Sequence, residues 1–455
     1  METERFDAIV LGAGPGGEVV VSRLAPRGLR VALVERELIG GECAYWACVP
    51  SKTLLRPPEI SSEAQRGFAV AAGAPDWAQA AGYRDYMVRG YDDARQVAEY
   101  GEMGVTVVKA PGRLAGPGAV EAGGRRLEAP HVVVATGSEP VIVPVEGLAE
   151  AGYWTNREAT SLRSVPRSAV VQGGGPVAVE VAQMLAGFGA KVTLVQRGGR
   201  LLSGLEPEAG ALLQDALEGA GVRVLTGATV VSLESGEEGR RVALSDGSAV
   251  IAEVFVAATG RRPRVGDLGL ESLGLEGERG LAIDDRGRVR GGPEGLWAVG
   301  DVTGVALFTH VAKYQGRAVA ANILAARGAG EPRDLDYAAV PRVTFTDPEV
   351  AAVGPTEAQA AASGPPVAAA TVELSSVSRS FTYEREPRGL LKLLARRDDG
   401  VVVGATAVGP LASEWIHIAA LAVRAGLPVS ALRDSMFQFP TFAEAFTVAA
   451  ERLSG

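Results

Sequence analysis

Two cysteines with only four residues between them are the most reactive pair in the sequence. Cys43 and Cys48 are the only cysteines among 455 residues. A disulfide across so short a loop would restrict the unfolded chain little, and the cytosol disfavours structural disulfides. At the start of a predicted helix, the helix dipole lowers the pKa of a thiol. We therefore predict a redox-active disulfide whose reduced form holds a thiolate near neutral pH.

A glycine-rich loop near the N-terminus has the composition and setting of a dinucleotide-binding turn. The run GAGPGG follows a predicted strand at 6–11 and opens a predicted helix, and an acid ends the next strand. In this pattern Gly12 permits a tight turn and Gly14 lets the backbone approach a pyrophosphate. Gly17 lets the helix pack closely on the strand, and the helix N-terminus attracts phosphate. We expect Glu35 to bind ribose hydroxyl groups.

The same strand, turn and helix pattern returns in the middle of the chain. The run GGGPVA begins at Gly173 and includes Gly175, and the predicted strand that follows it ends at Gln196 and Arg197. A neutral residue beside arginines, here Arg197 and Arg200, suits the 2′-phosphate of NADPH better than the ribose hydroxyl of NADH. We predict a second dinucleotide site that favours NADPH, with NADH as the alternative.

Three further strands end in turns that suit ligand contacts. Two apolar strands end in Ala-Thr-Gly, at Thr136-Gly137 and Thr259-Gly260, and a third is followed by Asp301. An acid at the carboxyl end of a parallel strand is placed to bind a hydroxylated ligand in the crevice of the sheet. The last quarter of the chain has short predicted strands followed by apolar helices, which indicates an α+β domain.

The composition is that of a globular protein with about three domains. The chain has 455 residues, a mass of 46.9 kDa, 47% hydrophobic and 22% charged residues. A formal charge of −9 argues against nucleic-acid and anionic-membrane partners. No apolar run reaches the roughly 18 residues of a membrane helix, and the N-terminus is unlike a secretory signal, so we expect a cytoplasmic protein. We predict that residues 53–95 are mostly helical and interrupted at Pro57, Pro58 and Pro75.

The order of these motifs resembles that of the FAD-dependent pyridine nucleotide-disulphide oxidoreductases, the family of glutathione reductase, dihydrolipoamide dehydrogenase and mercuric reductase. The matching segments are GGECAYWACVPSK from Gly40, Gly300-Asp301, VTFTDPE from Val343 and PTFAE from Pro440. The resemblance covers essentially the whole chain. It implies FAD in the first site, NAD(P)H in the second, and an obligate homodimer whose last domain completes the partner's active site.

The predicted fold class is α/β, with two Rossmann-like dinucleotide-binding domains and a C-terminal α+β dimerisation domain. The predicted boundaries are 1–153 with 276–330 for the FAD domain, 154–275 for the NAD(P) domain and 336–455 for the interface domain.

The resemblance also implies a role for each matched residue. Cys48 would be the thiolate that faces the flavin, and Cys43 the exposed thiol that exchanges with substrate. The ammonium group of Lys52 would lie near flavin N5 and pair with Glu180. The residues expected to contact FAD are Gly12, Gly14, Gly17, Glu35, Gly41, Thr136, Gly137 and Asp301, and those expected to contact NAD(P)H are Gly173, Gly175, Gln196, Arg197 and Gly260.

The C-terminal motif departs from the family pattern at one position. Disulphide reductases of this family carry a histidine immediately before Pro-Thr, held by a glutamate, and this histidine protonates the leaving thiol. Here the position is Phe439, which cannot carry a proton, whereas the glutamate is kept as Glu444. The three histidines are His131, His310 and His417, and none is expected to replace the missing base.

Three reaction classes fit these features. The first, which we favour, is an NADPH-dependent reductase that uses Cys43 and Cys48 on a disulphide or another thiol-reactive small-molecule substrate, with another acid or solvent supplying the protons. The second passes electrons from the flavin to a quinone or a second nicotinamide. The C-terminal motif of this chain resembles that of the soluble transhydrogenases, although those enzymes lack the second cysteine. The third resembles 2-ketopropyl-coenzyme M oxidoreductase/carboxylase, which has Phe at the histidine position but no acid corresponding to Glu444.

Two other interpretations are disfavoured. A flavin-binding sensor without catalysis does not explain why both nucleotide motifs are kept. Mercuric reductase is disfavoured because the sequence has no cysteine pair near its C-terminus and no N-terminal metal-binding cysteine motif. No metal site is predicted.

Overall fold

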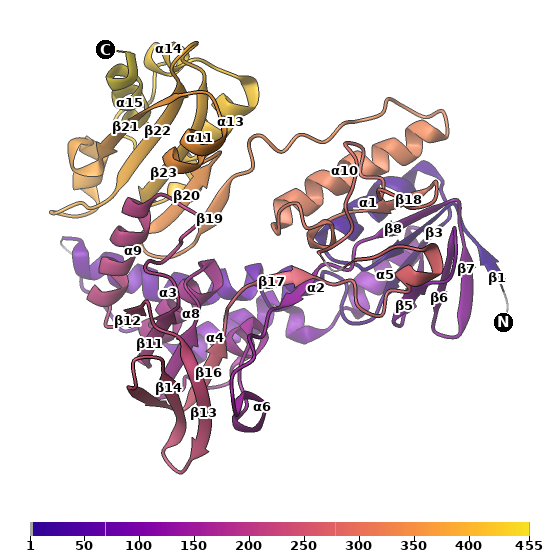
Figure 1. Ribbon diagram of the computed structural model, residues 1–455, viewed down its shortest axis with the longest axis horizontal. Coiled ribbons are helices and arrows are strands. Elements are labelled where there is room, and N and C mark those ends of the chain that lie inside the picture. Colours follow the sequence, from indigo (N-terminus) through magenta and orange to yellow (C-terminus); the bar gives the residue numbers. More distant parts are fainter. Residues whose placement is uncertain (1–2, 69, 278, 455) are drawn as a thin grey trace. The chain divides into compact units, whose positions relative to one another are not determined.

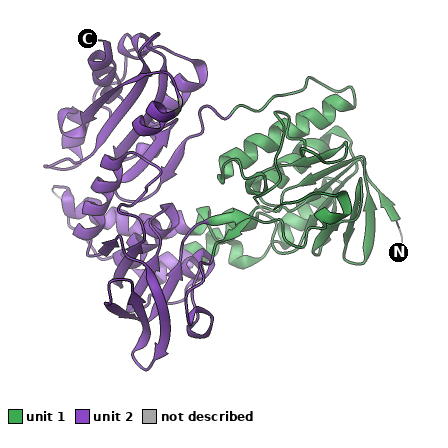
Figure 2. Cartoon of the chain, in the orientation of Figure 1, with its two compact units in different colours: residues 1–50, 84–141, 261–336 green, residues 51–83, 142–260, 337–455 purple. Residues whose placement is uncertain are grey.

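The computed structural model describes residues 3–68, 70–277 and 279–454 (Figure 1). The chain divides into two compact units (Figure 2). Unit 1 consists of residues 1–50, 84–141 and 261–336, and unit 2 of residues 51–83, 142–260 and 337–455. Within the described residues, no helix combines the length and the apolar character needed to cross a membrane.

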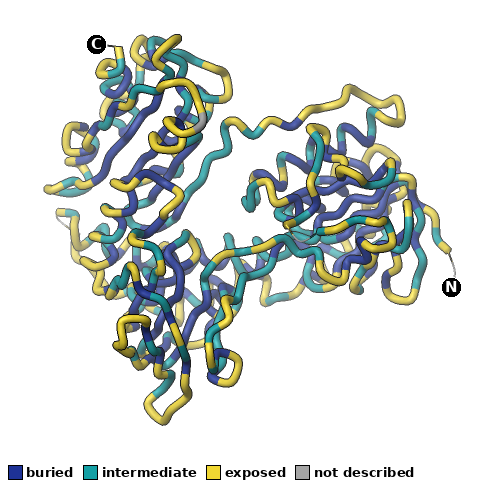
Figure 3. Tube along the Cα trace, in the orientation of Figure 1, coloured by how far each residue is buried: buried dark blue, intermediate teal, exposed yellow. Residues whose placement is uncertain are grey.

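Unit 1 is built on a parallel sheet of five strands in the order β18-β8-β2-β3-β4. Each central strand is a continuous apolar run, as expected for parallel strands covered on both faces, and Figure 3 shows this sheet as buried. Two helices that pack against each other, α1 and α10, follow the strands that carry the predicted FAD motifs. The bounds are β2 Ala8–Leu11, β3 Val31–Glu35, β4 Thr106–Lys109, β8 His131–Val134, β18 Leu296–Ala298, α1 Pro15–Leu24 and α10 Thr309–Ala326.

Smaller elements complete unit 1. A four-stranded sheet has the order β1-β7-β6-β5, and β9 pairs with β17. The strand bounds are β1 Thr3–Arg5, β5 Gly112–Leu114, β6 Ala119–Ala122, β7 Arg125–Glu128, β9 Ser138–Pro140 and β17 Arg261–Pro263. The helices are α2 Gly41–Tyr45 and α5 Ala94–Glu102, with short 3-10 helices η1 Ala25–Arg27, η2 Arg89–Tyr91, η3 Leu270–Leu273 and η4 Asp301–Thr303.

The middle part of unit 2 repeats the nucleotide-binding arrangement. Its parallel sheet has the order β12-β11-β10-β16, and helix α8 follows β10 directly. The bounds are β10 Ser168–Gln172, β11 Lys191–Gln196, β12 Arg223–Thr226, β16 Val254–Ala257, α8 Pro176–Gly187 and α9 Pro207–Gly219. An antiparallel sheet of β13 Val230–Gly236, β14 Gly239–Leu244 and β15 Ala249–Ala252 follows, and the short helices are α6 Leu148–Ala151 and α7 Asn156–Ser161.

The C-terminal part of unit 2 is an antiparallel sheet of five strands, in the order β19-β20-β23-β22-β21, covered by helices. The strands are β19 Arg342–Thr344, β20 Glu349–Val353, β21 Val367–Glu373, β22 Leu390–Arg396 and β23 Val402–Gly409. The helices are α11 Glu357–Ser363, α12 Ala412–Trp415, α13 His417–Ala425, α14 Val429–Arg433 and α15 Glu444–Ser454, with η5 Leu374–Ser376 and η6 Ser378–Thr382. Residues of β20, β22 and β23 belong to the same buried cluster as those of β10 and α8, which explains why the two parts form one unit.

The helical segment after the cysteines differs from the sequence prediction. Helix α3 spans Cys48–Arg66 and runs through Pro57 and Pro58, which were expected to interrupt it. The reason is tertiary packing: Leu54 is buried, and the Pro58 ring fits the space left by Gly187 of α8, where a side chain would overlap it. Helix α4 follows at Trp77–Met87, after a non-helical segment that contains Pro75. The two-unit division also differs from the predicted domain boundaries, which remain a prediction.

Candidate active site

The two cysteines lie beside one another at the start of helix α3, and a threonine bridges them. Cys43 belongs to the short helix α2, and Cys48 is the first residue of α3. The hydroxyl group of Thr309, the first residue of α10, donates a hydrogen bond to Cys43 Sγ at 3.2 Å and lies 3.4 Å from Cys48 Sγ. Thr309 therefore holds both sulphurs in place. No motif in the sequence marks Thr309, whose only signal is its place at the start of an apolar helix after Asp301.

The reduced cysteines are not equivalent. The hydrogen bond with Cys48, burial, and the negative charge of the Cys48 sulphur raise the pKa of the Cys43 thiol, and the charge of Lys313 only partly offsets this. For Cys43 this direction is opposite to the lowering expected from a helix dipole, because burial and the Cys48 sulphur both disfavour its thiolate. A thiolate at Cys48 therefore disfavours a second thiolate at Cys43.

The first glycine loop has the backbone shape that nucleotide binding requires. Gly12 has φ +101°, and a Cβ there would overlap the carbonyl oxygen of Ala135. A Cβ at Gly17 would overlap the carbonyl oxygen of Gly12. At Gly14, by contrast, a Cβ would meet no atom within 4 Å, so this side of the loop is open to a ligand at the N-terminus of α1.

Two carboxylates flank this loop. Glu35 Oε2 accepts the backbone N–H of Ala13 at 2.7 Å, which holds the carboxylate beside the glycines. Burial raises the pKa of Asp301, and the hydrogen bond from Ser138 Oγ at 2.6 Å partly offsets this effect. A half-buried carboxylate that follows β18 and can accept further hydrogen bonds suits a hydroxylated chain. The residues present therefore fit FAD.

The turn before the cysteines packs on the first glycine loop. Gly41 has φ +59°, and a Cβ at this position would lie only 3.0 Å from Gly14 Cα. On the other side, Thr136 Oγ1 donates to the carbonyl oxygen of Arg264 at 2.7 Å, and Gly137 has φ +74°. Both turns predicted to contact FAD thus lie within unit 1, as do the two cysteines.

The second glycine loop, in unit 2, has the same design. Gly173 has φ +132°, and a Cβ there would overlap the Ala258 carbonyl oxygen, while a Cβ at Gly175 would meet nothing within 4 Å. The Gln196 side chain folds over the loop, with Cδ 2.7 Å from where a Gly174 Cβ would be. The open space at the N-terminus of α8 fits a nicotinamide dinucleotide. Gly260, after β16, has φ +129°.

The two arginines after β11 have different surroundings. Arg197 is exposed. Arg200 is engaged by the protein, because its guanidinium donates to the carbonyl oxygens of Leu205 at 2.9 Å and Ser203 at 2.7 Å. Of the two, Arg197 is the better candidate for a 2′-phosphate.

Lys52 forms an ion pair with a buried glutamate in unit 2. Lys52 Nζ lies 2.7 Å from Glu180 Oε2 and 4.8 Å from the centre of the Phe345 ring. The other oxygen of Glu180 accepts the backbone N–H of Phe345 at 2.9 Å, so the carboxylate is fixed at both ends. Along α3, Lys52 follows Cys48 by four residues and therefore lies on the same helix face.

The C-terminal motif presents an exposed aromatic ring where the family pattern has a base. Phe439 is 64% exposed. Glu444 is the first residue of α15, and its Oε2 accepts the backbone N–H of Thr441 at 3.2 Å. The carboxylate thus has a structural contact at the helix start. Neither His131 nor His310 belongs to this motif. Burial lowers the pKa of His131 at the start of β8, and His310 stacks on Phe308.

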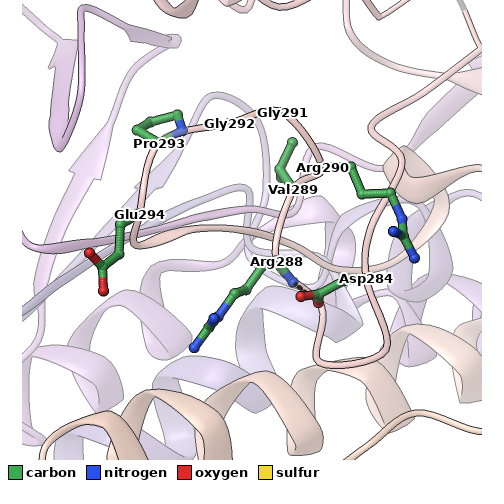
Figure 4. Close-up of a pocket in the computed structure, with 8 residues that line it drawn as sticks. All are labelled: Asp284, Arg288, Val289, Arg290, Gly291, Gly292, Pro293 and Glu294. Carbon is green, nitrogen blue, oxygen red and sulfur yellow. Dashed lines mark hydrogen bonds between the residues drawn. The ribbon is translucent and has the colours of Figure 1, made fainter.

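A surface cleft of about 470 Å³ lies in unit 1 around the turn from Asp284 to Glu294 (Figure 4). Asp284 accepts the backbone N–H of Arg288 at 2.9 Å, so its carboxylate is engaged within the turn. None of the residues predicted for chemistry lines this cleft. Throughout the described part of the chain, no three histidine, cysteine, aspartate or glutamate residues are grouped to hold a metal ion.

Comparison with known families identifies the class of protein. Residues 6–316 match the model of pyridine nucleotide-disulphide oxidoreductases, and residues 340–450 match the dimerisation domain of the same family. The chain belongs to this family. It is an α/β flavoprotein oxidoreductase that passes electrons from NAD(P)H through FAD to the cysteine pair, and its last domain is a dimerisation domain.

The individual relatives act on different substrates. The chain is 31% identical to a mercuric reductase from Staphylococcus aureus, over 98% of this chain and 82% of the relative. It is 32% identical to a dihydrolipoyl dehydrogenase from Geobacillus stearothermophilus, over 99% and 96% of the two chains. Among solved structures, the Cu(II) complex of the HOCl-induced flavoprotein disulfide reductase RclA from Escherichia coli superposes with a TM-score of 0.87, at 25% identity and over 99% of both chains.

Proposed function

We propose that the enzyme uses NADPH to reduce a thiophilic metal ion, such as Cu(II), through the Cys43 and Cys48 pair. The observation that carries this proposal is Phe439 at the position of the family's proton donor. After a thiol attacks a disulphide substrate, the leaving thiolate needs a proton, which Phe439 cannot supply. A metal ion bound by two sulphurs has no leaving thiolate.

The state of the reduced cysteines supports the same substrate class. The raised pKa of the Cys43 thiol weakens it as a nucleophile toward a disulphide, because the thiolate is the attacking form. A divalent metal ion, however, deprotonates a thiol that coordinates it. The similar structure that was solved as a Cu(II) complex fits this preference.

The proposed cycle balances with the groups on the chain. The cysteine pair would receive two electrons and one proton from NADPH through bound FAD, which would supply the hydride-transfer chemistry. The two electrons and the single proton of that hydride leave Cys43 as the thiol and Cys48 as the thiolate, so no further proton is taken up. Two Cu(II) ions then take one electron each and become Cu(I), the S–S bond forms again, and the Cys43 proton goes to water. Thr309 keeps both sulphurs together during these steps.

An anaerobic titration with NADPH tests the central step. If the pair accepts electrons, about two electrons per subunit produce a long-wavelength absorbance band from the Cys48 thiolate beside the flavin. Turnover is then compared with Cu(II), oxidised glutathione and lipoamide, each against a reaction without enzyme. Flavin bleaching without such a band would place the cysteines off the main path and favour a quinone or a second nicotinamide as acceptor.

Cofactor preference gives a prediction of its own. Arg197→Glu is expected to shift the ratio of kcat/KM for NADPH over NADH by about tenfold or more toward NADH, because a carboxylate repels the 2′-phosphate and accepts the ribose hydroxyl. The control is Arg223→Glu, since Arg223 is exposed at the opposite end of the same parallel sheet. An unchanged ratio in Arg197→Glu would exclude NADPH selection by this residue.

Restoring the family's base gives a second prediction. Phe439→His is expected to raise the rate with oxidised glutathione or lipoamide by about 10²-fold, the usual contribution of general acid catalysis, and to leave Cu(II) reduction within about twofold. Met436→His is the matched control, since Met436 is fully exposed three residues earlier. No gain with any disulphide would show that more than a proton donor is missing.

We further propose a cytoplasmic homodimer that binds neither nucleic acid nor membrane. Apolar side chains exposed on the dimerisation domain, among them Met436, Phe439 and Leu421, support pairing with a second copy. The formal charge of −9 argues against a polyanionic partner.

A further inference from the structure

We infer that Lys392 positions the loop whose Arg197 is proposed to bind the 2′-phosphate of NADPH. Lys392 is therefore a positioning residue for NADPH binding. The loop consists of residues 197–205, between β11 and α9. The inference rests on the proposed use of the second glycine loop for NADPH. Lys392 itself lies on β22 of the C-terminal sheet, within the same compact unit.

Lys392 is a buried cation surrounded by three carboxylates. It is 6% exposed, and its Nζ lies 3.1 Å from Glu206, 3.2 Å from Glu208 and 2.7 Å from Glu357. Burial alone would lower the pKa of Lys392, but the hydrogen bonds to these carboxylates raise it above its ordinary value. Lys392 therefore stays charged, and a buried charge with several partners is fixed in position.

Glu206 connects this cluster to the start of α9. It is 2% exposed and precedes Pro207, the first residue of the helix. One of its carboxylate oxygens accepts from Lys392, and the other accepts the backbone N–H of Glu357 at 2.6 Å. The beginning of α9 is thus attached at two points of the C-terminal part, at β22 through Lys392 and at the start of α11 through Glu357.

The loop before α9 is hydrogen-bonded both to itself and to the second glycine loop. Arg200 donates to the carbonyl oxygens of Ser203 and Leu205, which ties the loop to itself just before Glu206. The backbone N–H of Leu202, whose φ is +45°, donates to the carbonyl oxygen of Gly174 at 2.8 Å. Lys392 is thus connected through Glu206 and the loop to Gly174 of the second glycine loop. Arg197 lies on the same loop.

The test compares three variants with the wild-type holoenzyme. The first is the double variant Glu206→Gln, Lys392→Met. The side-chain amide oxygen of the glutamine can still accept the backbone N–H of Glu357, and no unpaired charge is left at the two buried positions. The second is Lys392→Arg, which keeps the positive charge and should therefore behave like the wild-type enzyme. The third is Lys191→Met, a control at an exposed lysine in the same unit. KM for NADPH and kcat are measured with ferricyanide as acceptor, and amide hydrogen exchange is followed over residues 197–205.

We expect the double variant to raise KM for NADPH about tenfold, which corresponds to about 1.4 kcal/mol, with kcat within about twofold. Exchange in the loop should accelerate by a similar factor. Faster exchange with an unchanged KM for NADPH would overturn the inference, because the cluster would then be structural only. Unchanged exchange in the loop would overturn it as well. If wild-type enzyme fails to bind NADPH, the proposed function fails, whereas the exchange data still decide whether Lys392 orders the loop.

Discussion

Replacing Cys48 by serine should abolish metal reduction while sparing the flavin. We expect Cys48→Ser to reduce Cu(II) at least about 100-fold more slowly than wild type, and to reduce ferricyanide with NADPH within about twofold of the wild-type rate. Serine oxygen cannot form a disulfide, so the variant has no dithiol to receive two electrons. The residues placed for FAD and NADPH are not altered, which explains why a dye that takes electrons from the flavin still reacts.

The matched variant is Cys43→Ser, which removes the exchange thiol but keeps the sulphur assigned to the flavin. It too should lose Cu(II) reduction, but it should show the long-wavelength band without added NADPH, because its Cys48 is never tied up in a disulfide. Stopped-flow spectra of both variants under anaerobic conditions separate the two roles. Full Cu(II) reduction by Cys48→Ser would mean that the metal takes electrons directly from the flavin, and the proposed role of the dithiol would be wrong.

The parts of the site that could be predicted from sequence are those set by short-range backbone requirements. Gly12 and Gly173 are needed because each turn has positive φ and a carbonyl oxygen directly behind it. The same glycine-rich turn occurs twice in the sequence, each time between an apolar strand and a helix. Local steric need of this kind leaves a recognisable pattern, which predicts both nucleotide-binding turns, whereas the resemblance to the family rests on the cysteine segment and the C-terminal motifs as well.

The parts that could not be predicted depend on contacts between distant segments. Thr309 reaches Cys43 across 266 residues, and Lys392 reaches Glu206 across 186. Nothing near either residue in the sequence marks it. Likewise, Pro58 was expected to end a helix because local propensity says so, and packing on Gly187 overrides that propensity.

The second large effect is expected at the first glycine loop. Gly17→Ala should yield protein without bound flavin, because the new Cβ would overlap the Gly12 carbonyl oxygen and the backbone on both sides must move. Such overpacking costs about 1–3 kcal/mol and displaces the turn that the pyrophosphate needs. The ratio of flavin absorbance to protein absorbance after purification measures the loss, and thermal unfolding measures the change in stability.

Gly14→Ala separates the ligand from the fold at the same loop. A Cβ at Gly14 meets no protein atom within 4 Å, and its φ is −72°, so we expect folding to weaken by about 1 kcal/mol at most. The affinity for FAD should nevertheless fall by about tenfold or more, because the methyl group occupies the open space through which the backbone approaches the pyrophosphate. Gly101→Ala, at an open helical position, should leave FAD content unchanged. If Gly14→Ala bound FAD as tightly as wild type, the pyrophosphate would have to lie elsewhere, and the assignment of this loop to FAD would fail.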